Sequence, residues 1–166
     1  MTGRRAALLD RLADHVLAHG LEGASLRPMA KAAGTSDRML LYYFPDKAAL
    51  IAATLQHLAA RLTRALDAQR APTPLPPDDL LPRLRSLVLS PLVWPYMRLW
   101  LDLAAAAARG DATARETGHA VARGFLGWIA AQLDSPAPER DAMRILVTLE
   151  GTSLLHALGL DTATGG

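Results

Sequence analysis

The stretch from Ser25 to Lys47, SLRPMAKAAGTSDRMLLYYFPDK, constrains the fold more than any other part of the sequence. Its first half has apolar residues at helical spacing, at Leu26, Met29, Ala30 and Ala33. Ser25 is in position to cap this helix through its hydroxyl oxygen. Gly34 follows the last apolar position and can adopt the positive φ of a sharp turn. The spacing therefore predicts a short helix that ends in a tight turn.

A second short helix is expected directly after that turn. Ser36 is in position to cap it, and Asp37 favours the positive end of the helix dipole. The helix must end near Phe44, because the residue before Pro45 avoids helical backbone. Two short helices joined by a turn that contains glycine form the helix-turn-helix pattern.

Helical periodicity continues through the rest of the chain, and no strand-like alternation interrupts it. Asp46 is expected to cap a long helix over 47–69, which would connect the head to the following residues. Further helices are predicted over 4–19, 79–89, 96–109, 111–133 and 139–158. The proline-rich segment 71–79 is the clearest internal boundary. The predicted fold is all-α, with an N-terminal three-helix head, a long connecting helix and a C-terminal helical body.

Several functional classes fit the sequence poorly. The chain has no cysteine, which excludes disulfides, thiolate catalysis and cysteine-based zinc sites. His15 and His19 have a spacing that could hold a metal, but no further ligands lie nearby, so no metal or cofactor is expected. No catalytic constellation can be placed, and we expect no enzyme activity. No signal peptide or membrane-spanning run is found, which favours a cytoplasmic location.

Charge is distributed unevenly along the chain. Residues 1–70 carry ten Lys or Arg against six Asp or Glu, whereas residues 71–166 carry eight against ten. A basic N-terminal part suits a nucleic-acid partner. The same excess also fits ordinary surface charge, because it falls short of a basic block.

Residues 4–58 resemble the TetR family of transcriptional regulators. The resemblance rests on S-L-R-x-M-A-x-A-A-G-T-S at 25–36 and on Y-Y-F-P-D-K-x-x-L at 42–50, with a helix before and a long helix after. It implies a DNA-binding domain over residues 1–45, a connecting helix over 46–70, and a ligand-binding and dimerisation domain over 46–166. Such a regulator would act on a double-stranded DNA operator.

The DNA contacts expected from this resemblance agree with the chemistry of the residues. A recognition helix presents its N-terminal residues to base edges, which here are Thr35, Ser36, Asp37, Arg38 and Met39. Arg38 is able to make a bidentate contact with guanine. The expected backbone contacts come from Ser25, Arg27, Tyr42, Tyr43 and Lys47, and from Arg4 and Arg5 in the N-terminal arm. Leu40 and Phe44 are expected in the core, one of the two tyrosines is expected to pack inward, and Arg27 equally fits a solvated surface charge.

Three positions depart from the family pattern. Arg38 stands where the family often has glycine, Leu41 replaces an aromatic residue that is usually tyrosine, and Tyr43 replaces histidine. Leu41 removes one expected phosphate contact, whereas Arg38 adds a possible base or phosphate contact. The alternative is therefore a helical ligand-binding or adaptor protein that has lost DNA binding.

The C-terminal half carries two further expectations. Wide apolar faces on the helices 111–133 and 139–158 would leave a large exposed patch on a monomer, and the family pairs two such helices in an isologous homodimer. An apolar small-molecule effector is expected in a pocket lined by Leu55, Leu58, Trp94, Tyr96, Met97, Trp100, Phe125 and Trp128. These residues equally fit a packed core. The candidates for a polar contact to the effector are His57, Asp102, His119, Thr148 and His156.

Overall fold

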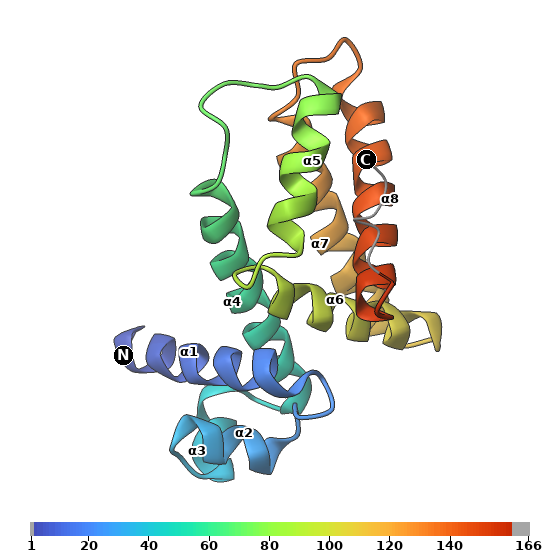
Figure 1. Cartoon of the computed structure of the whole chain (residues 1–166). Coiled ribbons are helices and arrows are strands. Elements are labelled where there is room, and N and C mark those ends of the chain that lie inside the picture. The colour runs from blue at the N-terminus through green and yellow to red at the C-terminus, as the bar shows by residue number, and fades with distance from the viewer. Residues whose placement is uncertain (1, 161–166) are drawn as a thin grey trace. The chain divides into compact units, whose positions relative to one another are not determined.

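The computed structural model describes residues 2–160, and the regular elements within them are all helices, which confirms the all-α prediction (Figure 1). The eight helices of this part are α1 (Thr2–His19), α2 (Leu26–Ala33), α3 (Asp37–Tyr43), α4 (Lys47–Asp67), α5 (Pro77–Val88), α6 (Trp94–Ala108), α7 (Ala112–Ala130) and α8 (Pro138–Ala157). None of these helices combines the length and the apolar character that a membrane span requires.

Three helices of the C-terminal half begin earlier than the sequence predicted, and each has proline in its first turn. α5 begins at Pro77, α8 begins at Pro138, and Pro95 follows the first residue of α6. Proline is tolerated there because first-turn amides have no partner within the helix.

The chain divides into two compact units, Met1–Ala65 and Leu66–Gly166. The first unit contains α1 to α3 and most of α4, so it extends beyond the predicted domain of residues 1–45. The physical reason is the contact between α1 and α4. Arg61 donates to Asp14 across 2.7 Å, and the His57 ring lies 2.7 Å from Asp10. The core of the unit consists of buried apolar side chains, among them Leu12, Met29, Leu40 and Leu50.

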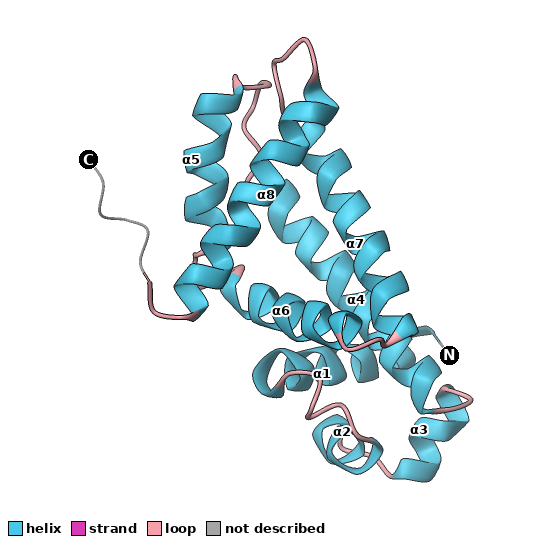
Figure 2. Ribbon diagram, turned by 90° about the vertical axis from the view of Figure 1, so that its right-hand side faces the viewer, coloured by secondary structure: helices cyan, strands magenta, loops and turns pink. Residues whose placement is uncertain are grey.

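In the second unit α7 packs against both α6 and α8, and α5 packs on α8. Figure 2 shows α6 running across the other three helices of this unit. Leu80, Leu84, Ile129 and Leu149 are the most buried of its large side chains. The proline-rich segment 71–79 lies inside this unit. Leu75 is held by backbone hydrogen bonds to Gln132 and Asp134, which join it to the end of α7.

A hydrogen-bonded network stabilises the N-terminus of α8. The Ser135 hydroxyl donates to the Asp141 carboxylate and accepts from the Ala137 amide. The hydrogen bond from Ser135 lowers the pKa of Asp141, and Arg140 and Arg144 act in the same direction. A lowered pKa means that the carboxylate stabilises the folded state above its unfolded pKa, and that this stabilisation is lost as the pH falls through the folded pKa.

We therefore expect Ser135→Ala to lower the free energy of unfolding near neutral pH, and the difference from the native chain to shrink on acidification. Urea titrations followed by tryptophan fluorescence would measure this, since all three tryptophans lie in the second unit. Asp141→Asn is the matched control, because it removes the titrating group. If the difference in unfolding free energy between Ser135→Ala and the native chain stayed the same from about pH 7 down to about pH 2, the stabilising role of the Ser135–Asp141 hydrogen bond would be contradicted.

Candidate nucleic-acid interface

The turn between α2 and α3 depends on Gly34. This residue has φ 67° and ψ 37°, a left-handed conformation that side chains with a Cβ rarely adopt. The Arg11 guanidinium of α1 donates to the Ala33 carbonyl at the end of α2, over 3.1 Å. A Cβ on Gly34 would lie 3.0 Å from the same guanidinium. The turn is therefore fixed by its own backbone and by a side chain of the neighbouring helix.

The helix starts in this region are capped largely as the sequence predicted. The Met39 amide donates to the Ser36 hydroxyl oxygen across 3.3 Å, and the Ala49 amide donates to the Asp46 carboxylate across 2.7 Å. The prediction for Ser25 was wrong in its mechanism. Ser25 occupies the N-cap position of α2, but its side chain makes no capping hydrogen bond. Its carbonyl accepts the Met29 amide instead.

α3 has a buried face and an exposed face. Leu40 and Phe44 are 0% and 1% exposed, so the prediction that they lie in the core is confirmed. Tyr43 is half-buried, whereas the neighbouring Tyr42 is 71% exposed. Their rings meet edge to face with centroids 5.4 Å apart. One of the two tyrosines is therefore partly turned inward, as expected.

The cations predicted to meet DNA are accessible in the first unit. Arg27 on α2, Arg38 on α3 and Lys47 at the start of α4 are all exposed. Within residues 2–160 none of them forms an ion pair with a carboxylate. These three charges are therefore available to neutralise phosphates.

The other predicted DNA contacts surround the same elements. Ser36 and Met39 are exposed, and Ser25, Thr35 and Asp37 are half-buried. Arg4 and Arg5, expected to add backbone contacts from the N-terminal arm, lie near the start of α1, within the helix that the sequence predicted over 4–19. The Arg5 guanidinium lies 4.9 Å from the centroid of the Phe44 ring, a cation–π geometry that no sequence spacing indicated.

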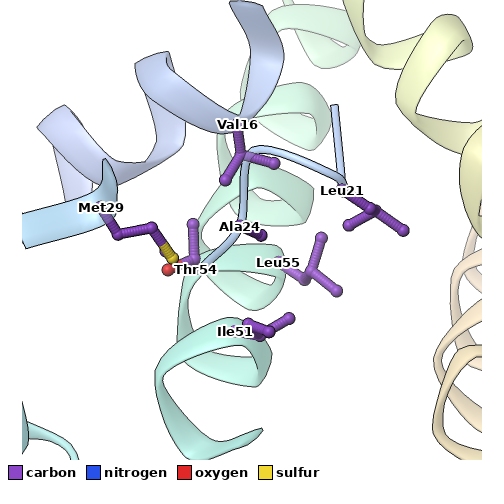
Figure 3. Close-up of a pocket in the computed structure, with 7 residues that line it drawn as sticks. All are labelled: Val16, Leu21, Ala24, Met29, Ile51, Thr54 and Leu55. Carbon is purple, nitrogen blue, oxygen red and sulfur yellow. The ribbon is translucent and has the colours of Figure 1, made fainter. Parts of the chain in front are cut away.

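The predicted effector-binding residues are divided between the two units. Leu55 and Leu58 belong to the first unit, where Leu58 is buried. Leu55 lines a shallow apolar hollow there, which leaves no room for a water molecule (Figure 3). Its walls are Val16, Leu21, Ala24, Met29, Ile51, Thr54 and Leu55.

The six other predicted pocket residues lie in the second unit, where most of the rings have defined partners. The Trp94 ring meets His156 edge to face at 4.5 Å, and Phe125 stacks on Trp128 at 5.6 Å. Trp128 also donates its indole N–H to Asp67 across 2.9 Å. Met97 is buried and Tyr96 is half-buried. Among the candidates for a polar contact, His156 lies against Trp94, a predicted pocket residue.

Sequence reasoning missed a polar contact on α8. Trp100 donates its indole N–H to the Glu150 carboxylate across 2.7 Å. Burial raises the pKa of Glu150, and the hydrogen bond from Trp100 opposes that rise. The buried hydroxyl of Ser153, one turn further along α8, has no hydrogen-bond partner among residues 2–160. No spacing signal could have revealed these contacts, because they depend on how α6 crosses α8.

The two histidines with metal-compatible spacing are otherwise engaged. The His15 ring nitrogen lies 3.1 Å from the Gly23 carbonyl, and the His19 ring nitrogen lies 2.9 Å from the His15 carbonyl. Their rings stack at 4.4 Å. Among residues 2–160 no group of three potential ligands converges on one point.

Comparison with known proteins places this head in a family. Residues 9–54 match the bacterial regulatory proteins of the tetR family. The HTH-type transcriptional regulator BetI of Pseudomonas paraeruginosa is 33% identical over 103 residues, which cover 59% of this chain and 51% of that protein. BetI of Paraburkholderia phymatum is 32% identical over the same length. The chain spans about half the length of these curated relatives.

Solved structures extend the likeness to the whole fold. A transcriptional regulator from Rhodococcus sp. Rha1 superposes with a TM-score of 0.72 at 26% identity, covering 92% of this chain and 82% of that one. The reduced form of NemR from E. coli superposes with a TM-score of 0.74 at 19% identity, and the match covers 95% of this chain and 89% of that one. The matched helix-turn-helix and the likeness in fold lead to one conclusion: the head of this chain belongs to the TetR family of transcriptional regulators.

Proposed function

We propose that this regulator is a cytoplasmic, ligand-responsive repressor that binds its DNA operator as a homodimer and is released by a small, largely apolar molecule. The observation that carries DNA binding is the exposed face of α3, where Arg38 forms no ion pair within residues 2–160, with Arg27 and Lys47 accessible on neighbouring elements. A buried or ion-paired set of cations would have favoured the adaptor alternative.

The roles of these cations differ by position. Lys47 begins a long helix, where its charge, its amide and the helix dipole all favour a phosphate. Arg38 is exposed near the N-terminus of α3, the part of a recognition helix that meets base edges. Tyr42 can donate its hydroxyl to a phosphate oxygen. In this arrangement Lys47 supplies affinity and Arg38 supplies sequence preference.

Dimerisation is supported by a solvent-facing apolar stripe along α8. Met143, Val147, Leu154 and Leu158 are 49%, 65%, 50% and 66% exposed. Their spacing places them on one side of the helix, with Gly151 in the middle. A Cβ on Gly151 would meet no atom within 4 Å, and the same is true of Gly124 and Gly127 on α7. This stripe therefore has the apolar surface and the small residues that a close helix–helix interface requires.

Release by an effector would act through α4. This helix runs unbroken from Lys47, which we assign to DNA, to Asp67, which the Trp128 indole holds in the second unit. An effector shifts the regulator only if it binds one conformation of the body more tightly than the other. The buried apolar side chains of α6 and α8, together with the half-buried aromatic side chains of α6, favour a largely apolar molecule.

Two substitutions test the division of roles. We expect Lys47→Ala to weaken binding to every DNA sequence and to reduce the salt slope by about one, because one phosphate contact is lost. Arg38→Ala should cost about 1–3 kcal/mol at particular base pairs and relax preference there. Electrophoretic mobility shifts over a salt series, on specific and scrambled duplexes, would measure both.

Arg64→Ala is the matched control, since Arg64 is an exposed cation near the other end of α4. It should leave binding unchanged. Equal loss of specific and non-specific affinity in Arg38→Ala would make Arg38 a phosphate contact and refute its assigned role.

A further inference from the structure

The exposed face of α3 is unusually apolar for a surface that meets a polyanion. On this helix of seven residues, Met39 is 40% exposed, Leu41 is 42% exposed and Tyr42 is 71% exposed. Arg38 is the one cation of the helix. α2 differs, since two of its three exposed residues, Arg27 and Lys31, are charged and the third is Pro28.

Helical geometry orders these side chains around α3. Arg38 and Tyr42 are four residues apart and occupy the middle of the exposed face. Met39 lies on one side of this pair and Leu41 on the other, while Leu40 faces the core at 0% exposure. Two apolar side chains therefore flank the arginine that is expected to reach base edges.

Neither flanking side chain can bind phosphate. Phosphate contacts come from cations and hydrogen-bond donors, and a hydrocarbon or thioether side chain provides neither. Among the groups that base pairs present in the major groove, the C5 methyl of thymine is the apolar one. The exposed cations Arg27 and Lys47 supply the charge that holds a duplex against this face.

We infer that Met39 and Leu41 are specificity-determining residues that contact thymine methyl groups beside the base pair read by Arg38. The inference rests on the proposed DNA binding and deepens it, because it assigns a base chemistry to the two positions. It also gives a positive role to Leu41, whose lack of a hydroxyl would otherwise count only as a lost phosphate contact. The expected operator carries thymines at these positions.

The test uses the full chain and a duplex that the chain itself selects from a randomised pool. Each thymine of that duplex is replaced in turn by deoxyuridine, which removes the methyl group and leaves every hydrogen-bonding group in place. We expect a loss of affinity of about fourfold at each thymine whose methyl is buried against Met39 or Leu41. At a given thymine, the loss of affinity on deoxyuridine substitution should disappear in the variant, Met39→Ala or Leu41→Ala, that lacks the side chain in contact with that methyl.

Leu92→Ala is the control, because Leu92 is similarly exposed but lies in the second unit. It should retain the full sensitivity to deoxyuridine. Circular dichroism checks that the head variants remain folded. The inferred methyl contacts are refuted if deoxyuridine changes the affinity at no position. They are also refuted if it changes the affinity equally in the native chain and in both head variants. A chain that enriches no duplex would refute the proposed function as well, so the two failures are distinguishable.

Discussion

Replacement of Val147 by glutamate is expected to convert the proposed homodimer into a monomer and to weaken operator binding by about 100-fold or more, since an unpaired charge at an interface costs several kcal/mol. Val147 is 65% exposed in the single chain and lies in the apolar stripe of α8. In a two-fold symmetric interface each substitution appears twice, so two carboxylates would lose water together. A monomer would then present one recognition helix in place of two.

The fold of the single chain should survive this change. Val147 faces solvent there, and glutamate has a higher helix propensity than valine. Ala104→Glu on α6 is the matched control, because it places the same charge on an exposed helix position outside the stripe. Sedimentation velocity would measure the association state. A Val147→Glu chain that sediments like the native chain, with both as dimers, would show that the interface lies elsewhere.

Leu40→Ala is expected to destabilise the head by about 2–5 kcal/mol, the usual cost of truncating a buried leucine. Leu40 is 0% exposed and holds α3 in place from its inner face. Because net stabilities are themselves small, a loss of this size would leave much of the head unfolded and abolish DNA binding. Hydrogen exchange at the amides of α2 and α3 would follow the effect within the first unit.

Leu41→Ala provides the comparison, since it makes the same chemical change one residue later. Leu41 is 42% exposed, and surface substitutions of this kind usually change stability by less than about 0.5 kcal/mol. We expect its amide protection to match that of the native chain. If both variants lost protection equally, the distinction between the inner and outer faces of α3 would be wrong.

Sequence reasoning succeeded where local chemistry determines the structure. The apolar spacing before Gly34, the cap at Ser36 and the cap at Asp46 each depend on residues within one or two turns, and the structure confirms them. Leu40 could be assigned to the core because the helix period places it opposite the exposed positions.

Features that depend on two distant elements were missed. The cap on α2 that Arg11 provides, the contact of Arg5 with Phe44, and the Trp100–Glu150 hydrogen bond all join separate helices. Their partners are fixed by how helices cross, which side-chain spacing does not encode. Proline in the first turn also moved the starts of α5 and α8, because proline at these positions is compatible with helix.

The most direct test of DNA binding through α3 is the affinity of the full chain for a fragment that carries its own promoter, measured over a salt series. We expect log affinity to fall steeply and linearly with log salt concentration, with specific binding retained over a scrambled fragment. The slope reports how many phosphates the exposed cations neutralise. Flat, negligible binding even at low salt would contradict the account and favour a helical ligand-binding or adaptor protein.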